Sequence, residues 1–473
     1  MIRARFAPSP TGYLHIGSAR TFIFNWLFVR KHHGTMVLRI DDTDVDRNTE
    51  ASLQSIYDGL DWLSLKWDEF HRQSERLDLH RRLAYELLAQ GAAYRDFTPA
   101  VTDLEGKPHG EGPWLCNPEM RALSQEESDR RADAGEPFAI RFRVNRERPY
   151  EVTFRDEVYG PQSKLTADIE DFALLRSNGM PTYHLSSCAD DVDLKITHII
   201  RGQDHLSNTF KHILIFEAAR APLPRFAHLP LLIGPDGSKL SKRRHGPVVS
   251  VTTYRDQGFL AMGYINFLCL LGWSPKDNRE QMTLYELTNA FSFEGVHRSN
   301  AVVQFSDADP IDPKALWLNA QHLRTMPVAT LAPLVRDSLQ ARGLAPYGDE
   351  AFFEHVVDTI RTRFSTLLDF STKGQAYFSD DYPMEPQALE KLNVPGAREL
   401  LYELGDRLEA SPEFTEASVE AELRKLAGER GVKAGVLINA SRAALTGQPV
   451  GPSAFAVFTC VGRERAIQRL RRA

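Results

Sequence analysis

The stretch from Phe6 to Arg20, F-A-P-S-P-T-G-Y-L-H-I-G-S-A-R, constrains the fold of this chain more than any other segment. The residues around its start, 2–7, predict a short strand. Pro8 and Pro10 then exclude a helix and hold the backbone extended. Residues 15–18 fall where the next helix begins. We therefore expect a strand, a loop and a helix in direct succession.

The expected helix is amphipathic, and a second strand follows it. Apolar side chains recur with helical period at Phe22, Ile23, Trp26 and Leu27. Gly34 is expected as the C-cap of the helix, before a strand over 35–40. A strand, a helix and a second strand make a βαβ unit, in which ligands bind beyond the carboxyl ends of the strands. The sequence thus predicts an α/β fold with a ligand site at that edge.

A phosphate group suits the start of this helix. The first backbone N–H groups of a helix have no partner within it, and the positive end of its dipole lies there. Gly17 lets a ligand approach the backbone closely, and His15 can donate a hydrogen bond to a phosphoryl oxygen. Taken alone, a histidine at such a place is more often packed or capping. The interpretation therefore depends on a second element.

That second element is the loop G-P-D-G-S-K-L-S-K-R-R-H-G at 234–246, which follows an apolar run over 229–233. Lys239, Lys242 and Arg243 could close over a triphosphate and neutralise the leaving pyrophosphate. An isolated basic loop is usually only solvated. Because this loop occurs together with the helix start around His15, we interpret it as a nucleotide-binding loop.

The two segments in this order, H-I-G-S at 15–18 and K-L-S-K-R at 239–243, resemble the signatures of class I aminoacyl-tRNA synthetases, and P-S-P-T-G at 8–12 resembles the bacterial glutamyl enzymes. The resemblance implies a Rossmann-like catalytic domain and catalytic roles for His15 and Lys242. It also implies that ATP is bound by His15, Gly17, Asp204, Leu232, Lys239, Ser241, Lys242 and Arg243.

By the same resemblance, Arg5 on the first strand and Arg201 in H-I-I-R-G-Q-D-H-L hold the side-chain carboxylate of glutamate. Such charge-assisted bonds leave the amide of glutamine poorly paired, so the site rejects this isostere. Ser9 and Tyr183 supply hydroxyl groups, and Asp41 in R-I-D-D-T-D faces the α-ammonium group. The full set implied for glutamate is Arg5, Ala7, Ser9, Asp41, Tyr183, Ser187 and Arg201.

The sequence departs from the family pattern at three positions. Asp41 stands where the family usually has a glutamate, one methylene longer, so either a water molecule bridges to the ligand or the substrate sits deeper. The alternative is that Asp41, Asp42 and Asp44 cap the next helix and form solvated ion pairs. Gln203 stands where an acidic residue is common. Leu240 replaces the methionine of K-M-S-K-S and keeps its volume and apolarity.

The chain, 473 residues of which 42% are hydrophobic, is long enough for several domains. From about residue 94 it is rich in Pro, Gly and charge and then alternates as strands do, which indicates an inserted segment. In the family an acceptor-stem domain splits the catalytic fold there, and helical domains follow. We therefore expect an α/β catalytic domain in 1–93 and 192–246, an inserted α+β acceptor-stem domain in 94–191, a helical stem-contact domain in 247–322, and an all-α anticodon-binding domain in 323–373 and 374–473. Apolar periodicity predicts helices over 388–408 and 417–426.

Cysteine usage and the apolar segments indicate a cytoplasmic protein. Four scattered cysteines, Cys116, Cys188, Cys269 and Cys460, form no C-x-x-C pair and are expected to be reduced thiols. Some relatives carry a zinc-binding cysteine cluster in the inserted domain, but the matching stretch at 92–100 has no cysteine, so we expect no zinc and no other protein-bound metal. The apolar stretch 259–273 is too short to span a bilayer, and no signal peptide is visible. We expect a cytoplasmic monomer without a membrane segment.

The charge balance is unusual for a protein that binds RNA. The chain has 57 basic and 63 acidic side chains, a net charge of −6, whereas phosphate contacts normally come with a basic surface. Basic residues can cluster locally, as in the segment 462–473 and at Arg361 and Arg363. For the terminal segment, a solvated helix is the alternative.

The resemblance implies tRNA(Glu) as RNA partner, with tRNA(Gln) as the alternative in a non-discriminating enzyme. Arg363 in I-R-T-R-F and Arg442 in S-R-A-A-L resemble anticodon-contact positions of the family, and arginine can bond a base edge in bidentate fashion. Alternatively, Arg363 pairs with Asp358 or Asp369 across helix turns. On this basis we expect a preference for tRNA(Glu).

The implied reaction has two steps in one site. The α-carboxylate of glutamate attacks the α-phosphorus of ATP, and the terminal ribose hydroxyl of tRNA then takes the glutamyl group. Catalysis would rest on positioning and on His15, Lys242 and backbone amides, with Mg²⁺ bound to ATP rather than to a protein cage.

Three other kinds of protein share part of this pattern. A small nucleotidylyltransferase of the same superfamily would not need the inserted and carboxy-terminal regions. A non-catalytic RNA-binding relative would be expected to lack His15 or Lys242, and both are present. A shortened relative that glutamylates a tRNA base lacks the anticodon-binding part, which this chain retains.

Overall fold

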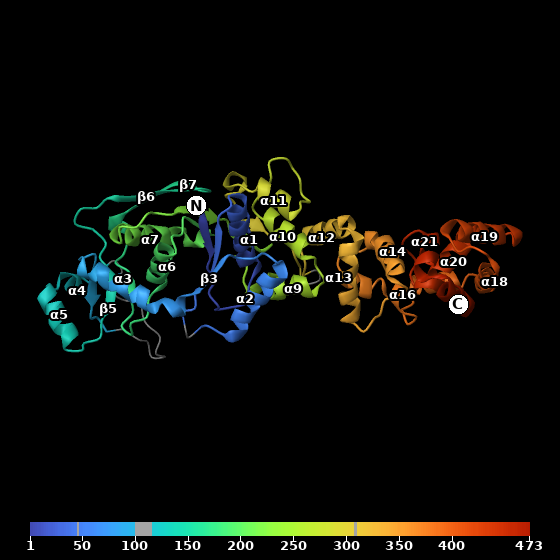
Figure 1. Cartoon of the computed structure of the whole chain (residues 1–473), viewed down its shortest axis with the longest axis horizontal. Coiled ribbons are helices and arrows are strands. Elements are labelled where there is room, and N and C mark those ends of the chain that lie inside the picture. Colours follow the sequence, from blue (N-terminus) through green and yellow to red (C-terminus); the bar gives the residue numbers. More distant parts are fainter. Residues whose placement is uncertain (45–46, 100–115, 307–309) are drawn as a thin grey trace. The chain divides into compact units, whose positions relative to one another are not determined.

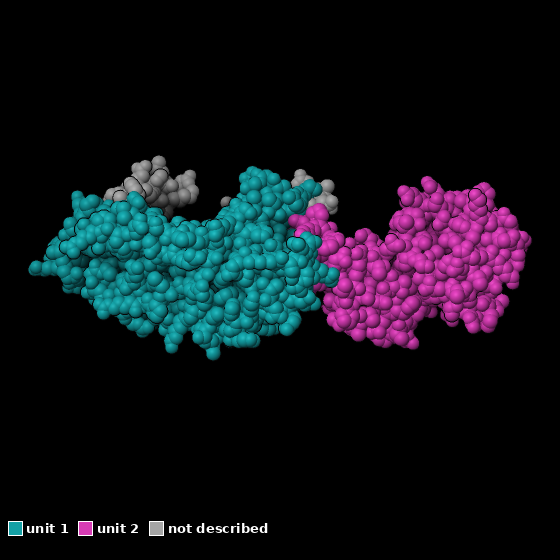
Figure 2. Space-filling model, turned by 90° about the horizontal axis from the view of Figure 1, so that it is seen from above, with its two compact units in different colours: residues 1–253, 265–310 teal, residues 254–264, 311–473 magenta. Residues whose placement is uncertain are grey.

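The structure is a computed structural model that describes residues 1–44, 47–99, 116–306 and 310–473. The chain forms two compact units, coloured teal and magenta in Figure 2. The first unit comprises residues 1–253 and 265–310, and the second comprises residues 254–264 and 311–473. The first unit is built around a β-sheet, and the described part of the second unit is helical.

Seven strands form the main sheet, in the order β3-β2-β1-β9-β10-β6-β7. Neighbouring strands pair in parallel except β6 and β7, which form an antiparallel hairpin. The chain runs from β1 to β3 in one direction across the sheet and from β9 onward in the other, so β1 and β9 meet at a topological switch point, where α/β sheets bind ligands. The strands are β1 (Arg3–Phe6), β2 (Thr35–Ile40), β3 (Glu69–Arg72), β6 (Glu151–Asp156), β7 (Gly160–Leu165), β9 (His198–Gly202) and β10 (Arg225–Leu229).

The strand, loop and helix predicted at the amino terminus are confirmed. β1 leads through the proline-containing loop into α1 (Ile16–Lys31), and β2 follows. The prediction that Gly34 caps α1 is wrong, because His32 is the C-cap and His33 takes the left-handed conformation with φ of 50°. Gly34 serves close packing instead: a Cβ there would lie 2.5 Å from the carbonyl oxygen of Ile2.

The segment expected to form the inserted domain contributes to two sheets. β4 (Ala93–Asp96), β5 (Ala139–Phe142) and β8 (Ala173–Leu175) form a separate antiparallel sheet, and α4 (Pro118–Ala122) and α5 (Gln125–Asp133) lie between β4 and β5 in the chain. The β6–β7 hairpin instead extends the main sheet through β10. Part of this segment is therefore continuous with the main sheet, and the expected domain boundaries stay a prediction.

Helices of the first unit cover the main sheet, and one cluster of buried side chains, including Val37, Leu185, Ile199, Ile213 and Phe226, joins sheet and helices. In Figure 1, α6 and α7 lie together beside the sheet. Besides α1, α4 and α5, the α-helices before residue 300 are α2 (Glu50–Leu63), α3 (Leu77–Ala89), α6 (Tyr183–Asp193), α7 (Leu206–Ala218), α8 (Lys242–His245), α9 (Val251–Asp256), α10 (Ala261–Leu270) and α11 (Leu284–Ala290). Two short strands, β11 (Leu232–Ile233) and β12 (Ala301–Val302), form a parallel pair.

The second unit has one continuous hydrophobic core, which includes Leu331, Phe353, Leu401, Leu437 and Phe458. The helix predicted over 388–408 is two helices, because Gly396 adopts a left-handed φ of 79° between them; the helix predicted over 417–426 is confirmed within α19. The helices are α12 (Pro313–Thr325), α13 (Val328–Gln340), α14 (Glu350–Ile360), α15 (Leu368–Ser371), α16 (Gln375–Phe378), α17 (Pro386–Leu392), α18 (Ala397–Ala410), α19 (Glu416–Glu429), α20 (Ala434–Thr446), α21 (Ala454–Val461) and α22 (Arg463–Arg472).

The basic carboxy-terminal segment is folded into this core. Helix α22 buries Arg465 and Arg469, which are 7% and 5% exposed. Both donate to a carboxylate oxygen of Asp380, at 3.0 Å and 2.7 Å, and Arg469 also donates to the backbone oxygen of Ala376 at 2.8 Å. For these two arginines, the expectations of a tRNA-binding patch and of a solvated helix are both wrong, because their donors are used within the unit.

The apolar stretch 259–273 contains the ten-residue helix α10. Across the described ranges, no helix has the length and apolarity needed to cross a membrane. The four cysteines are free thiols, three of them buried.

Candidate active site

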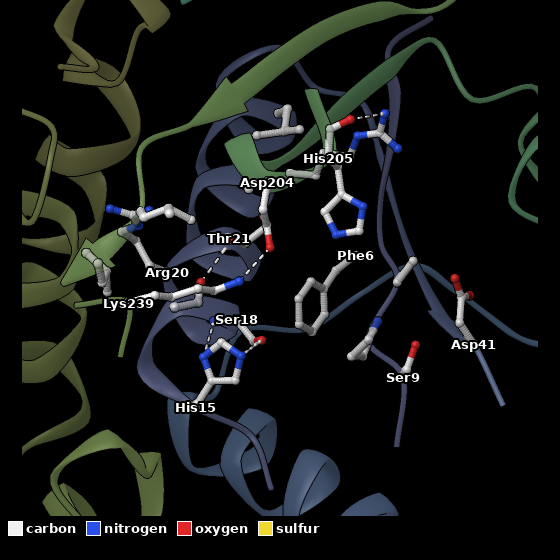
Figure 3. A pocket seen from close by; sticks show the side chains of 18 of the residues that line it. Phe6, Ser9, His15, Ser18, Arg20, Thr21, Asp41, Asp204, His205 and Lys239 are labelled. Atoms are coloured by element: carbon white, nitrogen blue, oxygen red, sulfur yellow. Dashed lines mark hydrogen bonds and ion pairs between the residues drawn. The ribbon is translucent and has the colours of Figure 1, made fainter. Parts of the chain in front are cut away.

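A cavity of about 320 Å³ opens at the carboxyl ends of β1 and β9. The loop after β1, the start of α1, the loop after β9 and the residues around β11 form its wall. In Figure 3, His15 and Lys239 lie toward one side of the cavity and Asp41 toward the other. The predicted ATP and glutamate residues that line it are Arg5, Ala7, Ser9, His15, Gly17, Asp41, Tyr183, Ser187, Arg201, Asp204, Leu232 and Lys239.

Three predicted ATP-binding residues are not placed in this wall. Ser241 precedes α8 and is exposed, and it is not among the lining residues. The side chains of Lys242 and Arg243, in the first turn of α8, lie outside the described part of the structure. The roles of these three residues stay predictions from the motif.

His15 caps α1 and also faces the cavity. Its Nδ1 accepts a hydrogen bond from the backbone N–H of Ser18 at 3.3 Å, so Nε2 carries the proton, 3.0 Å from the hydroxyl of Ser18. A Cβ at Gly17 would lie 3.1 Å from the imidazole, so glycine is needed for the ring to fold over the helix start. Desolvation by the surrounding protein and the charge of Lys239 lower the pKa of His15. The ring is therefore a neutral donor at pH 7.

Lys239 forms an ion pair across the mouth of the cavity. Its Nζ lies 2.7 Å from a carboxylate oxygen of Asp204, which follows β9. Both side chains are more than a third exposed, so the pair is weak and can be exchanged for another partner. The cation and the free N–H groups at the start of α1 make this side of the cavity suited to phosphate groups.

Arg201 is a buried cation that lacks an anionic partner. The residue is 6% exposed and lines the cavity, and no carboxylate of the described residues lies within ion-pair distance of its guanidinium group. Burial lowers the pKa of Arg201. An unpaired buried charge is costly, so a ligand carboxylate in this cavity would relieve that cost.

Arg5 differs from Arg201 because a protein carboxylate already neutralises it. Its Nε and Nη2 donate to the two oxygens of Asp191, at 3.0 Å and 3.3 Å. Asp191 also accepts from Nη1 of Arg39 at 2.8 Å, and Arg39 donates to both oxygens of Asp41, at 2.7 Å and 3.2 Å. These four side chains form one buried network of alternating charge.

Asp41 belongs to this network, and the alternative that it caps the next helix is wrong. Thr49 caps α2, and the half-buried Asp44 pairs with the exposed Arg47. Asp41 is only 7% exposed but lines the cavity. Burial raises the pKa of Asp41 to about 6, although Arg39 opposes the shift. The side chain is therefore mostly ionised at pH 7 and presents a negative charge to the cavity.

Two hydroxyl groups line the same cavity as the two arginines. Ser187, on α6, is 1% exposed, and its hydroxyl has no hydrogen-bond partner within the described structure. The hydroxyl of Tyr183 accepts from Nη1 of Arg201 at 3.1 Å and lies 2.9 Å from Nδ1 of His205. A buried hydroxyl without a partner is unfavourable, so Ser187 is available to a polar ligand.

Sequence reasoning missed Arg39, Asp190 and Asp191. Asp190 accepts from Gln73, Arg76 and His80, at 2.8 to 2.9 Å, and so ties α3 and the turn that precedes it to α6. A signal existed: in Y-H-L-S-S-C-A-D-D-V-D the two aspartates share a helix with buried Leu185 and Cys188. Carboxylates on the buried side of a helix imply buried cations nearby.

Arg363 and Arg442 are close enough for their charges to interact. Arg442 is half-buried and donates to the backbone oxygen of Pro452 at 2.7 Å, and burial, together with Arg363, lowers the pKa of Arg442. The alternative that Arg363 pairs with Asp358 or Asp369 is wrong, because Arg361 takes Asp358 and Lys373 takes Asp369. The exposed Arg363 has no ion-pair partner among the residues that the structure describes. Its anticodon role stays a prediction.

Among the described residues, no group of three or more His, Cys, Asp or Glu side chains is arranged to hold a metal ion.

Comparison with known proteins assigns the family. Residues 1–309 match the family of tRNA synthetases class I (E and Q), catalytic domain, and residues 330–473 match the anticodon binding domain. The glutamate–tRNA ligase of Solibacter usitatus is 54% identical to this chain, covering 99% of this chain and 98% of that protein. Glutamate–tRNA ligase 2 of Koribacter versatilis is 46% identical, covering 100% and 98%.

A solved structure agrees with these matches. The crystal structure of a glutamate tRNA ligase from Elizabethkingia meningosepticum in complex with its amino acid has a TM-score of 0.85 to this chain at 30% identity, covering 100% of this chain and 98% of that one. The chain therefore belongs to the class I aminoacyl-tRNA synthetases of the E and Q type. Within that class it belongs to the glutamate–tRNA ligases, and the resemblance and fold predicted from the sequence are confirmed.

Proposed function

We propose that this chain attaches L-glutamate to tRNA(Glu) through a glutamyl-adenylate intermediate formed from ATP. One observation carries the proposal: the cavity combines the buried, carboxylate-free Arg201 with the start of α1 and Lys239. A guanidinium group suits the side-chain carboxylate of an amino acid, and a helix start beside a cation suits a triphosphate.

The two arginines and Asp41 would orient glutamate between them. Its γ-carboxylate would displace the hydroxyl of Tyr183 from Nη1 of Arg201 and accept from that nitrogen, from Arg5 and from the unpartnered hydroxyl of Ser187. The α-ammonium group faces Asp41. Each oxygen of Asp41 accepts one hydrogen bond from Arg39, which leaves a lone pair on each for a ligand. This polar set discriminates against glutamine, whose amide nitrogen would face arginine donors.

The activation step needs positioned charge rather than a side-chain nucleophile. An oxygen of the α-carboxylate attacks the α-phosphorus of Mg²⁺-bound ATP, and pyrophosphate leaves. Negative charge develops on the phosphoryl oxygens, where Nε2–H of His15 and the first N–H groups of α1 can donate, with Lys239 and Lys242 as cations. The terminal ribose hydroxyl of tRNA then attacks the carbonyl carbon of the adenylate, and AMP leaves.

The proposed RNA partner is tRNA(Glu), and the proposed setting is the cytoplasm. The exposed, unpaired Arg363 beside Arg442 supports reading of the tRNA anticodon and a preference for tRNA(Glu) over tRNA(Gln). We propose that the enzyme acts as a monomer in the cytoplasm, where its four free thiols would remain reduced.

Exchange of pyrophosphate into ATP tests the activity directly. We expect exchange with glutamate and tRNA together, and none with glutamine, with aspartate or without tRNA. Exchange with glutamine at a rate comparable to that with glutamate would refute the assigned amino acid. Charging of purified tRNA(Glu) and tRNA(Gln) side by side decides the RNA partner, since equal kcat/KM values would show a non-discriminating enzyme.

A further inference from the structure

The guanidinium group of Arg201 is held entirely by neutral groups. Every one of its N–H donors has an acceptor within the protein, and none of these acceptors is a carboxylate. Arg201 Nε donates to Nε2 of His228 at 3.2 Å, Nη1 to the hydroxyl of Tyr183 at 3.1 Å and to Nδ1 of His212 at 3.3 Å, and Nη2 to the hydroxyl of Thr209 at 2.7 Å and to the backbone oxygen of His205 at 3.2 Å.

The imidazole of His228 can accept from Arg201 only in one tautomer. Its Nδ1 lies 2.6 Å from a carboxylate oxygen of Asp156, and an ionised carboxylate can only accept. The proton therefore sits on Nδ1, so Nε2 is an acceptor, and both Nε of Arg201 and the hydroxyl of Thr209, at 3.1 Å, lie within hydrogen-bond distance of it. Asp156 is itself fixed, because its other oxygen accepts from the backbone N–H groups of Val158 and Tyr159, at 3.0 Å and 2.9 Å.

The three residues lie on three adjacent strands of the main sheet. Arg201 is on β9, opposite His228 on β10, and Asp156 is on β6, next to β10. His228 is fully buried, and Asp156 is 1% exposed. Burial lowers the pKa of His228, which keeps the ring neutral at pH 7. Asp156 thus lies behind the cavity wall, and it is not among the cavity-lining residues.

We propose that Asp156 and His228 are positioning residues for glutamate: Asp156 sets the tautomer of His228, and His228 orients the guanidinium of Arg201 without neutralising it. A carboxylate in the place of His228 would cancel the charge that the substrate needs, whereas a neutral acceptor leaves it for the ligand. Carboxylates fix the tautomer and orientation of metal-bound and catalytic imidazoles in the same way. Here the imidazole that is fixed orients an arginine. This inference rests on the proposed function, in which Arg201 binds the γ-carboxylate.

The variant Asp156→Asn tests the tautomer. On the side of Val158 and Tyr159 its amide nitrogen would meet two backbone N–H groups, whereas on the other side it would meet one, that of His228 at 3.1 Å, so it should turn toward His228 and donate to Nδ1. Nε2 of His228 then carries the proton and faces Nε–H of Arg201. We expect KM for glutamate to rise by about tenfold or more, with kcat and KM for ATP within about twofold of wild type.

Variants of His228 separate orientation from folding. His228→Leu removes the acceptor and should raise KM for glutamate as Asp156→Asn does. His228→Gln keeps an oxygen near the position of Nε2 and should restore KM to within about threefold of wild type. In the double variant Asp156→Asn/His228→Gln, the asparagine should add no further loss. His198→Leu is the matched control, since His198 is a buried histidine on β9 that bonds Thr197 and does not contact Arg201.

The outcomes separate the inference from the function on which it rests. If wild-type protein shows no glutamate-dependent exchange, the proposed function fails. If wild type is active and Asp156→Asn leaves KM for glutamate unchanged, the inference is wrong. It is equally wrong if Asp156→Asn costs as much in the His228→Gln background as alone, or if KM for ATP rises in parallel, because Asp156 would then act only on the general structure of the sheet.

Discussion

At the residue scale, two buried arginines of one cavity have different electrostatic surroundings. Arg5 shares Asp191 with Arg39, whereas Arg201 has only neutral acceptors. The protein therefore neutralises one cation itself and leaves the other for the ligand. Since an uncompensated buried charge is costly, Arg201 would, in the proposed function, favour an acidic amino acid over a neutral one.

Replacing Arg201 should therefore affect catalysis more than stability. We expect Arg201→Ala to lower kcat/KM for glutamate by on the order of 2–5 kcal/mol. Arg5→Ala should cost as much in catalysis and also lower the thermal midpoint, because Asp191 loses a buried partner. Steady-state exchange assays and thermal unfolding distinguish the two. Arg225→Ala, on the exposed end of β10, is the control, and near wild-type kcat/KM in Arg201→Ala would contradict the assignment.

The charge of Asp41 predicts a pH dependence. Burial raises its pKa to about 6, so the proton that binds as pH falls through that value removes the charge facing the α-ammonium group. KM for glutamate should therefore rise as the pH falls from about 7.5 to about 5.5, whereas KM for ATP should not change in the same way. Asp41→Asn should have a raised KM at all pH values and no such rise. A KM for glutamate that is flat over this range in wild type would rule out the role of Asp41.

Lys242 provides a test of the motif alone. Its contact with the phosphoryl oxygens is expected to be strongest in the transition state, so Lys242→Ala should reduce kcat for activation far more than it raises KM for glutamate. Pre-steady-state formation of the adenylate, measured with tRNA present, reports this step. An unchanged kcat would instead support the alternative that K-L-S-K-R is only a solvated basic loop.

At the scale of elements, the ligand site depends on how closely β1, α1 and β2 approach one another. Gly34 permits the turn from α1 into β2, because its missing side chain leaves room for the carbonyl group of Ile2 beside it. That carbonyl belongs to the backbone just before β1, from which the proline-containing loop leads to His15. The spacing of the two parallel strands therefore sets where the helix start and Arg5 lie.

Gly34→Ala should destabilise the first unit even though it lies outside the cavity. The added Cβ would sit 2.5 Å from a backbone oxygen, so strand or turn must shift, at a cost of roughly 1–3 kcal/mol. Thermal or urea unfolding measures the loss. Gly12→Ala is the matched control, since a Cβ there meets nothing within 4 Å, and equal stability of both variants would contradict the packing argument.

At the scale of the whole molecule, the distribution of charge differs from what the linear sequence indicates. The net charge is −6, and the basic terminal segment uses Arg465 and Arg469 inside the second unit. Arg363, by contrast, is exposed and has no ion-pair partner among the described residues. Charge that is consumed within the fold does not contribute to a phosphate-binding surface.

Arg363→Gln tests whether this residue discriminates between tRNAs. The bidentate donor is lost but hydrogen bonding is not, so we expect the ratio of kcat/KM for tRNA(Glu) to that for tRNA(Gln) to fall by about 1–3 kcal/mol in equivalent free energy. Aminoacylation of both purified tRNAs measures it. Arg361→Gln is the control, because Arg361 is already paired with Asp358. A ratio that Arg363→Gln leaves untouched removes the residue from anticodon reading.

The sequence by itself determined those features that depend on residues close together in the chain. Two prolines, a glycine and the start of an apolar period suffice to predict the strand, the loop and the helix. The residue types of the basic loop at 239–243 suffice to predict that it binds phosphate groups. The family followed from the order of these short motifs. These patterns are local, so they can be interpreted without knowing how the chain packs.

Only the tertiary structure decided which charges neutralise each other. Arg5 meets Asp191 across 186 positions, and His228 meets Asp156 across 72, where no periodicity connects the partners. The same holds for Gly34, which the sequence predicted as a helix cap but which in the structure makes room for the carbonyl group of Ile2. It also holds for Arg469, which lies in a basic segment of the sequence but is buried in the structure. Burial sets the strength and the partner of a charge, and burial exists only once distant strands have come together.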